Sequence, residues 1–350
     1  MIEPCSPTGN ISTRPSGTNE KRDCIGEHAG SVAVSKAIRH IGNISADNAA
    51  TVLQATWRGF AGRRTLSVRR VGPGLILTQV NAGTSMLPRM GLAMDAGGEE
   101  IAGGCWRFAI LAVDQTRYLS TVAMGSALAK PRDFLVGSPD TVAVINGGFY
   151  NFEHRVSADA PEHAVVGSCR TDGRDQPSLP IPQRYSDDYV TLDFEDGSVF
   201  HTAPRLSIDG SPSFSQEKLL ESRYRVSEDF DFAVQTIRPG ELMHAADPNP
   251  RAAISRPHDT AHGYARLVVG LAQARGREAG SGYSLVQWSQ LMARVDRMEQ
   301  PPNSSVNLDG GGSVAMVVAA ADGHWINVMQ STPCRDVANC IRIVQRDAFD

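Results

Sequence analysis

Three short segments of this sequence combine residue types that could do chemistry together. Residues 145–150 read INGGFY, residues 249–255 read NPRAAIS, and residues 307–313 read NLDGGGS. Consecutive glycines let backbone N–H groups converge on an anion without a Cβ in the way. A carboxylate directly before such a loop is unfavourable unless it has a task or a cationic partner, so Asp309 is a candidate catalytic group. Arg251 is the candidate cation, because a guanidinium holds phosphate in a bidentate fork.

Each of these residues has a structural alternative when it is taken alone. Asp309 can cap a turn, Asn146 can adopt the left-handed conformation that turns require, and Arg251 can be a structural ion-pair partner. His154, shortly after the first segment, can be an ordinary surface histidine. A further alternative is a calcium or magnesium site, in which Asp309 and Asn146, with Asn307, supply the oxygen ligands that hard cations prefer.

Taken together and in this order, the three segments resemble the signature motifs of the phosphodiester glycosidase family, enzymes that cut a sugar from a phosphodiester-linked sugar. Two further stretches fit the family's pattern: residues 267–271 followed by 281–285, and residues 335–339 (RDVAN). The resemblance covers about residues 75–346. The departures from the pattern are Ser255, Val314 and the insert between Phe152 and Tyr189. They lie beside the predicted site, so they affect substrate identity more than catalysis.

The resemblance implies a hydrolase that cleaves a glycosyl-1-phosphodiester bond. An ordinary glycosidase protonates a poor leaving group with one carboxyl group and uses a second carboxylate as nucleophile or base. A sugar linked through phosphate already carries a good leaving group, so the protein needs donors for the departing phosphate and one carboxylate. The implied catalytic residues are Asp309, Asn146, Arg251, Asn307, Glu153 and His154. The implied substrate-binding residues are Gly147, Gly148, Tyr150, Gly310, Gly311, Gly312 and Ser313.

In this scheme Asp309 is the carboxylate, Arg251 and the amides of residues 310–312 hold phosphate, and Glu153 and His154 handle protons. Two other functions stay open. A phosphodiesterase would break the P–O bond of a nucleotide-derived or lipid phosphodiester, and a catalytically dead domain would only bind calmodulin. The intact motifs favour an enzyme.

Short runs of β-branched residues must position these loops. Strands are predicted at 75–80, 108–113, 141–145, 190–194, 265–271, 314–319 and 341–344. A helix is predicted over 285–298, because Ser284 and Gln287 form a capping-box pattern before an apolar face. The expected fold is α+β, with a mixed β-sheet core and flanking helices in a catalytic domain over 75–350, plus an N-terminal basic helix.

That basic helix is predicted over residues 45–71, within an IQ-like region that ends with Gly-Pro-Gly at 72–74. It matches the IQ motif of calmodulin-binding helices at Leu53, Gln54, Trp57, Arg58, Gly59, Phe60 and Arg63. Calmodulin is acidic, and its grooves take an aromatic anchor on a basic amphipathic helix. Residues 50–70 are therefore predicted to bind calmodulin. The alternative is a basic helix that packs on its own domain or on a membrane surface.

The composition of the chain excludes several other classes of protein. The 350 residues are 41% hydrophobic with a formal net charge of −4, which is typical of a globular protein and excludes a general attraction to nucleic acid. No apolar run is long enough to span a membrane, and the six cysteines show no zinc spacing. Residues 1–44, rich in Ser, Thr and Pro at their start, are predicted to be disordered and resemble type III secretion signals. We therefore expect a bacterial effector secreted by a non-classical route into host cytoplasm and activated there by calmodulin; without that route the protein would be cytoplasmic.

Overall fold

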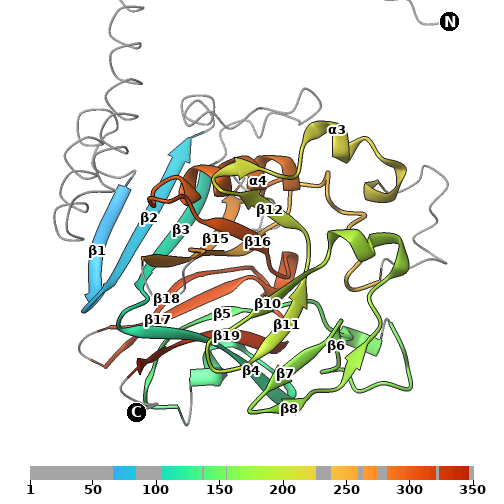
Figure 1. The fold of residues 1–350 in the computed structure, drawn as a ribbon, viewed down its shortest axis with the longest axis horizontal. Helices are drawn as coiled ribbons and strands as arrows, with labels where there is room; N and C mark the ends of the chain where they lie inside the picture. The colour runs from blue at the N-terminus through green and yellow to red at the C-terminus, as the bar shows by residue number, and fades with distance from the viewer. Residues whose placement is uncertain are drawn as a thin grey trace, which may run out of the picture.

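The computed structural model describes residues 66–83, 105–135, 138–154, 156–225, 238–258, 263–273, 282–320 and 323–346. Within these residues the chain is mostly antiparallel β-sheet, built around two large sheets (Figure 1). The predicted disordered segment 1–44 and the IQ motif at 53–63 lie outside the described residues, so both stay predictions.

The larger sheet has eight strands in the order β1-β2-β3-β15-β14-β16-β12-β13. They are β1 (Leu66–Gly72), β2 (Leu75–Gly83), β3 (Cys105–Asp114), β12 (Arg205–Ile208), β13 (Ser211–Pro212), β14 (Arg251–Arg256), β15 (Tyr264–Gln273) and β16 (Ser304–Asn307). The antiparallel pair β3 and β15 runs from Asp114 opposite Tyr264 to Cys105 opposite Gln273. This long register fixes β14 and β16 beside it, and these two strands carry the second and third motifs.

The smaller of the two has five strands in the order β18-β17-β5-β19-β4, again with antiparallel pairing. They are β4 (Tyr118–Ala129), β5 (Thr141–Asn146), β17 (Ala315–Ala319), β18 (Trp325–Gln330) and β19 (Val337–Gln345). The central strand β5 is buried along almost its whole length. The INGGFY motif therefore leaves the sheet from its centre.

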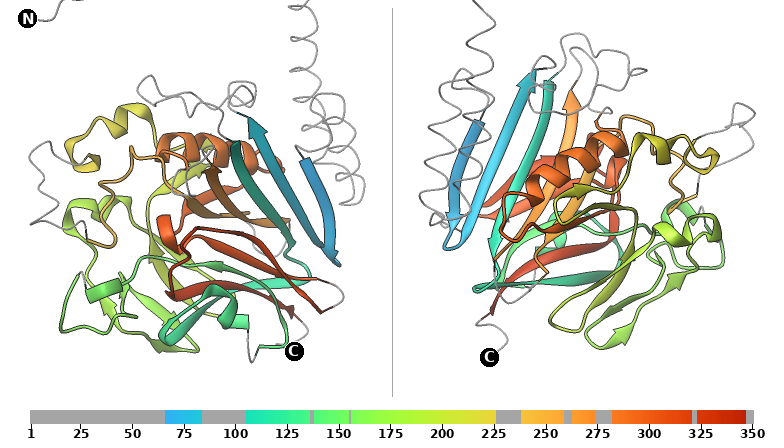
Figure 2. Two further views of the ribbon diagram at one scale, coloured as in Figure 1. Left: turned by 180° about the vertical axis from the view of Figure 1, so that it is seen from behind. Right: turned by 45° about the horizontal axis from the view of Figure 1, so that its top comes forward.

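Two hydrophobic cores lie on opposite faces of the eight-stranded sheet. Successive side chains of a strand point to opposite faces, so β3 sends Leu111 into one core and Ile110 into the other. Leu111 shares its core with Ile145 of the five-stranded sheet. Ile110 shares its core with Trp288 and Met292 of helix α4 (Leu285–Asp296), which lies across the strands as the orange helix in Figure 2. The five-stranded sheet and α4 thus cover the two faces.

The remaining elements are short. A four-stranded sheet contains β10 (Val190–Asp193), β11 (Val199–Thr202), β7 (Cys169–Thr171) and β8 (Arg174–Asp175), and a parallel pair contains β6 (Val165–Val166) and β9 (Ser178–Leu179). The short helical segments are η2 (Pro131–Leu135), η3 (Phe152–His154), η4 (Gln183–Asp188), α3 (Gln216–Leu219), η5 (Ser222–Tyr224) and η6 (Gly311–Ser313). The predicted helix at 285–298 corresponds to α4, and its capping box between Ser284 and Gln287 is present.

The predicted α+β class, with a mixed sheet core and flanking helices, is wrong. In the described part of the chain α4 is the one helix longer than two turns, and both large sheets pair antiparallel throughout. The segments between strands are mostly turns and short strands, so the main core is closed by a second sheet rather than by helices. None of the described helices has the length and apolar character needed to cross a membrane.

The predicted N-terminal helix over 45–71 is also wrong for residues 66–71, which belong to strand β1. In this strand Val68 is buried and Arg69 is exposed. Gly74 has a φ of 73°, which lets the Gly-Pro-Gly segment turn the chain into β2. Pairing with β2 decides the conformation, because tertiary contacts override the weak helix propensity of such a segment.

Candidate active site

The three motif segments meet where the two large sheets adjoin. Asp309 follows β16, and its N–H donates to the carbonyl of Gly147, just after β5, at 2.9 Å. The N–H of Gly311 donates to the carbonyl of Pro250, just before β14, also at 2.9 Å. Backbone hydrogen bonds therefore join three loops that are far apart in the sequence.

Asn146 holds two of these loops together. Its side chain is fully buried; Nδ2 donates to the carbonyl of Asp309 at 2.8 Å, and Oδ1 accepts from the N–H of Ala315 at 3.2 Å. Both ends of the amide are thus used on backbone groups, one in the third motif at Asp309 and one at the start of β17 at Ala315. The structure places Asn146 as a positioning residue behind the loop.

Asn307 has a different environment. Its Nδ2 donates to the carbonyls of Ala203 at 2.9 Å and Leu308 at 2.6 Å. Its Oδ1 is buried and has no hydrogen-bond partner among the described residues. Asn307 lines the cavity described below, so this acceptor is available to a donor on a ligand.

The oxygen atoms considered for the alternative calcium or magnesium site already take part in hydrogen bonds inside the protein. The Oδ1 of Asn146 already accepts from a backbone N–H, and both carboxylate oxygens of Asp309 accept hydrogen bonds within their own loop. Across the described ranges, no three His, Cys, Asp or Glu side chains come together as a metal-binding group. We therefore derive no step through a bound cation.

Asp309 is a carboxylate held by its own loop. Oδ1 accepts from the N–H of Gly310 at 2.9 Å, and Oδ2 accepts from the hydroxyl of Ser313 at 2.5 Å. Burial raises the pKa of Asp309, while Arg335, the Ser313 hydroxyl, the Gly310 N–H and Arg251 act in the opposite direction. A carboxylate with a raised pKa is a stronger base, which suits a group that accepts a proton.

Arg251, at the start of β14, is a buried guanidinium held by backbone carbonyls. Nε donates to the carbonyl of Tyr283 at 2.9 Å, and Nη2 donates to the carbonyls of His244 at 3.0 Å and Asp247 at 3.1 Å. In the described chain no carboxylate forms an ion pair with it at contact distance. The predicted fork is therefore used largely to fix the side chain in place.

The remaining nitrogen of Arg251 is turned toward the third motif. Nη1 lies 3.7 Å from the position that a Cβ on Gly310 would occupy, and no described residue accepts a hydrogen bond from it. Burial lowers the pKa of Arg251 to about 10, against the opposing effects of Asp247 and Asp309. The guanidinium thus stays charged at neutral pH, and a buried cation with an unused donor favours an anionic ligand.

The glycines serve close packing more than phosphate binding. A Cβ on Gly147 would lie 1.7 Å from Oδ1 of Asn339, and the N–H of Gly148 donates to that same atom at 2.7 Å. The amides of Gly310 and Gly311 donate to Asp309 and to the carbonyl of Pro250. Two of the three amides predicted to bind phosphate, those of Gly310 and Gly311, are therefore already used inside the protein. No described residue accepts a hydrogen bond from the N–H of Gly312, so this amide is still a candidate phosphate donor.

Tyr150 and Ser313 lie beneath the site and support it. The hydroxyl of Tyr150 donates to the carbonyl of Asp336, and burial raises the pKa of this phenol. Its ring packs on Phe152 with centroids 5.8 Å apart. Ser313 is buried and donates to Asp309. Both side chains therefore fix the loop rather than face a ligand.

The side chains of Glu153 and His154 have different surroundings in the structure. Both have positive φ angles, 54° and 52°, so the backbone turns sharply at this point. Glu153 is exposed and lines the cavity. His154 is directed away from it: Nδ1 lies 3.2 Å from the carbonyl of Ala160, and Nε2 lies 3.7 Å from Oε1 of Glu162.

A cavity of about 630 Å³ opens beside Asp309. Its wall includes the arginines Arg238, Arg251 and Arg335, the carboxylates Glu153, Glu241 and Asp309, and the aromatic rings of Phe149 and Phe152. This volume lies within the range of small-molecule sites, roughly 300–1,000 Å³. Cations for a phosphate, carboxylates for hydroxyl groups and apolar rings suit a phosphorylated sugar.

Four titratable residues of this wall were given no role by the sequence: Arg238, Glu241, His244 and Arg335. Arg335 stacks on Phe152, with its guanidinium carbon 4.0 Å from the ring centroid, and it packs against Gly312. The RDVAN motif marked its position without indicating a function. His244 lies in the wall and contacts Asp247, but no metal-ligand or catalytic spacing singled it out.

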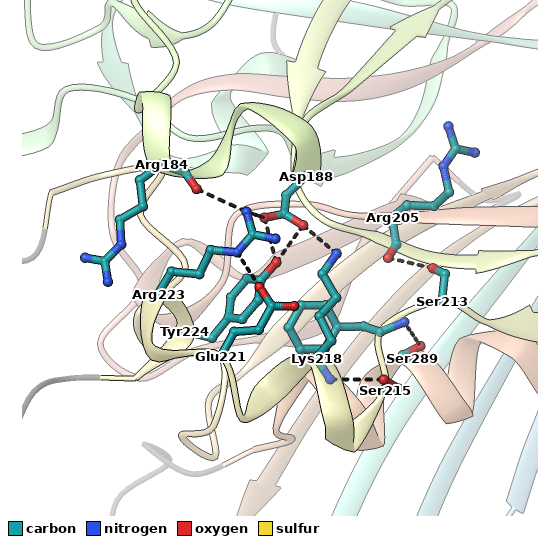
Figure 3. A network of polar contacts seen from close by, with 11 residues as sticks. Arg184, Asp188, Arg205, Ser213, Ser215, Lys218, Glu221, Arg223, Tyr224 and Ser289 are labelled. Carbon is teal, nitrogen blue, oxygen red and sulfur yellow. Dashed lines mark hydrogen bonds and ion pairs between the residues drawn. The ribbon is translucent and has the colours of Figure 1, made fainter.

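A buried network supports the wall at Gly240 (Figure 3). Asp188 is fully buried, pairs with Lys218 at 2.6 Å and Arg223 at 3.4 Å, and accepts from the hydroxyl of Tyr224. The next residue, Tyr189, donates to the carbonyl of Gly240 at 3.0 Å. The network therefore anchors Tyr189, which in turn holds this part of the wall.

Fold and site together define an antiparallel β-sheet protein with a carboxylate beside an arginine-lined cavity. Residues 139–344 match the model of the phosphodiester glycosidase family. The chain belongs to this family and is a hydrolase that acts on a sugar phosphodiester. A comparison with curated proteins finds no match.

Two solved structures are similar to this chain at low sequence identity. The catalytic domain of zebrafish N-acetylglucosamine-1-phosphodiester alpha-N-acetylglucosaminidase, auto-inhibited by its pro-peptide, is 15% identical over 81% of this chain and 90% of that chain, with a TM-score of 0.48. An exported protein of Burkholderia pseudomallei is 13% identical over 80% of this chain and 96% of that chain, with a TM-score of 0.50. The second likeness shows a common fold and nothing finer.

Proposed function

We propose that this hydrolase cleaves a glycosyl-1-phosphodiester bond in the cavity beside Asp309. The observation that carries the proposal is the unused Nη1 donor of Arg251, which lies next to Gly310 and therefore directly beside the carboxylate-bearing loop. A buried cation and a carboxylate with a raised pKa on one cavity wall supply the two functions that the chemistry needs: an anion site for phosphate and a base for water.

The proposed reaction uses residues on the wall. Arg251 and Arg335 stabilise the charge that develops on the departing phosphate. Water attacks the anomeric carbon, the bond between that carbon and the phosphate oxygen breaks, and its electron pair leaves with the phosphate. Asp309 takes the proton from the water. The unpartnered Oδ1 of Asn307 accepts a hydrogen bond from a sugar hydroxyl.

A panel of 1-(methyl phosphate) diesters of glucose, mannose and N-acetylglucosamine tests this function. The Asp309→Asn variant removes the charge and keeps the shape, so turnover of the diester that the wild type cleaves should fall by about 10²- to 10⁴-fold. Asp175→Asn is the matched control, because Asp175 is exposed on β8, pairs with Arg170 and is not part of the cavity wall. Near-normal turnover in folded Asp309→Asn, or no cleavage of any diester, would overturn the proposal.

The nature of the products separates this function from its alternatives. Release of free sugar and methyl phosphate supports the glycosidase. Release of a sugar 1-phosphate and methanol would instead indicate a phosphodiesterase that breaks the P–O bond. A folded wild type that binds calmodulin and cleaves nothing would be a catalytically dead binding protein.

We further propose that calmodulin binds the IQ motif and activates the enzyme. The support is the match at 53–63 in the sequence, together with the position of β1, which begins at Leu66 and forms the edge of the sheet that carries β14 and β16. Calorimetry and kinetics on wild type and on a triple alanine variant at Leu53, Gln54 and Trp57 test it. Activation requires tighter binding to the active state. The variant should lose binding and stimulation but keep basal activity; no calmodulin binding to wild type, with or without calcium, would refute it.

The same two sequence features support a proposed role as a bacterial effector that a type III system delivers into the host cytoplasm. They are the Ser/Thr/Pro-rich start and a motif for a eukaryotic sensor. A translocation reporter fused after residue 44 should reach host cells from secretion-competent bacteria only. Equal signals from competent and secretion-deficient strains would contradict this role.

A further inference from the structure

His244 and Asp247 form a pair in the wall of the cavity. Nδ1 of His244 contacts Oδ2 of Asp247, and each side chain is about half exposed. His244 is one of the residues that line the cavity. The hydrogen bond from His244 is the main reason why the pKa of Asp247 lies below its usual range. Asp247 is therefore ionised at neutral pH and fixes one ring nitrogen, which leaves Nε2 for other contacts.

The loop that carries this pair wraps around Arg251. The carbonyls of His244 and Asp247 both accept from Nη2 of Arg251, at 3.0 and 3.1 Å. The imidazole is thus attached, through its own backbone, to the guanidinium that offers Nη1 to a phosphate. The negative charges of Asp247 and Asp309 both act to raise the pKa of Arg251, against the larger effect of burial.

We propose that His244 is the proton donor to the departing phosphate, with Asp247 as its positioning residue. This inference rests on the proposed glycosidase function. As the bond from the anomeric carbon to oxygen breaks, its electron pair stays on the phosphate oxygen, and Nε2 of the imidazolium gives that oxygen its proton. Water supplies the new oxygen on the sugar and gives its proton to Asp309. Solvent then takes the proton from Asp309 and returns one to His244.

Other charged groups of the wall are less suited to this role. The carboxylate of Glu241 accepts a hydrogen bond from the backbone N–H of Arg238 at 3.0 Å, so it holds the turn at residues 238–241. His154 is turned toward Glu162 and lies outside the wall. His244 combines an orienting carboxylate with a place beside the anion site, the arrangement that defines an acid–base residue.

The chain offers a matched control for this pair. His258 and Asp209 form a second exposed histidine–aspartate contact, through Nε2 and Oδ1, and neither residue lines the cavity. His258→Gln therefore removes an imidazole of the same kind away from the site. His244→Gln keeps the backbone carbonyl that holds Arg251, so the anion site itself stays formed.

The first test measures the binding of methyl phosphate, the expected leaving group, by calorimetry from about pH 5.5 to about pH 8.5, a range that spans the ordinary histidine pKa of about 6.5. The ratio of wild-type to His244→Gln affinity cancels the titration of the ligand itself. We expect about a 10- to 100-fold ratio at the acidic end, the value of one charge-assisted hydrogen bond, falling toward unity at the alkaline end. A ratio of one at every pH, or the same loss in His258→Gln, would overturn the contact.

The second test measures the pH profile of kcat on the sugar 1-(methyl phosphate) diester that the wild type cleaves. His244→Gln should lower kcat by about 10- to 100-fold, less than the loss of an acid that serves an alkoxide leaving group, and should remove the alkaline limb. Asp247→Asn should lower kcat because the ring of His244 loses its orienting carboxylate, and Asp247→Glu, which keeps a carboxylate, should restore part of the loss. A kcat of Asp247→Asn equal to that of wild type would overturn the positioning role. If the wild type cleaves no diester, the proposed function fails and the proton-donor role with it, while the binding ratio still reports whether His244 meets phosphate.

Discussion

Arg251→Lys separates the structural and anion-binding roles of this arginine. The side chain donates three hydrogen bonds to backbone carbonyls and keeps Nη1 for a ligand. A lysine ammonium is a single point, so it can reach one of these carbonyls but cannot span Tyr283 and the loop of His244 at once. The substitution therefore leaves two acceptors without the charged donor and moves the positive charge away from Gly310.

The size of the effect follows from the contacts that are lost. Two hydrogen bonds from a charged group contribute about 1.5–3 kcal/mol each, and water from the open cavity replaces part of this, so the free energy of unfolding should fall by about 3 kcal/mol. Methyl phosphate affinity should fall at least about tenfold. Urea denaturation and calorimetry measure the two quantities.

Arg266→Lys is the control for this variant. Arg266 is equally buried in the same sheet, pairs with Glu299, and has no described partner for Nε or Nη1. A lysine there can keep the ion pair, so stability should change by about 1 kcal/mol or less and methyl phosphate binding should not change. The reasoning is refuted if Arg251→Lys matches wild type in both stability and phosphate affinity, or if Arg266→Lys loses as much of both.

Three further predictions concern the scaffold. Gly147→Ala puts a Cβ into Oδ1 of Asn339, so urea denaturation should show a loss of about 3 kcal/mol, and an unchanged midpoint would contradict the close packing of β5 and β19. Asp188→Asn leaves Lys218 and Arg223 without their buried partner and should cost about 3 kcal/mol in the same assay; a change below about 0.5 kcal/mol would show that the network carries no stability. Burial raises the pKa of Asp296 above its unfolded value of about 3.9, so the folded state binds the proton more tightly, and this contribution to stability is lost as pH rises through the folded pKa. Asp296→Asn should flatten that part of the pH–stability curve, and an identical slope in wild type and variant would refute the assignment.

Much of the strand content could be predicted from the sequence, because short β-branched runs bounded by turns encode strands locally. Helix α4 could also be predicted from the local sequence, because its capping residues Ser284 and Gln287 lie at its own N-terminus. Residues 66–72 were not predicted as a strand, because a basic segment next to a helical motif pairs as β1 only when β2 is present. The prediction of the fold class was wrong for a related reason. Whether a helix or a second sheet covers a sheet depends on contacts between strands that are distant in the sequence.

The sequence predicted which residues belong to the site better than it predicted what each of them does. The sequence indicated that Asp309 and Arg251 belong together, and the structure joins their loops by backbone hydrogen bonds. The sequence did not indicate that the side chain of Asn146 bonds to the backbone or that Gly147 packs against Asn339. Those partners come from distant parts of the chain. His244 carried no local signal, since its place is fixed by carbonyl contacts to a side chain seven residues away.

The most direct measurement of the central claim is hydrolysis in heavy-oxygen water. Wild type and Asp309→Asn are incubated with the sugar 1-(methyl phosphate) diester that the wild type cleaves, and the products are analysed by mass spectrometry. If water attacks the anomeric carbon beside Asp309, the label appears in the sugar, the methyl phosphate carries none, and product formation falls by about 10²- to 10⁴-fold in the variant. Label in a phosphate product, or unchanged product formation by folded Asp309→Asn, would contradict the account.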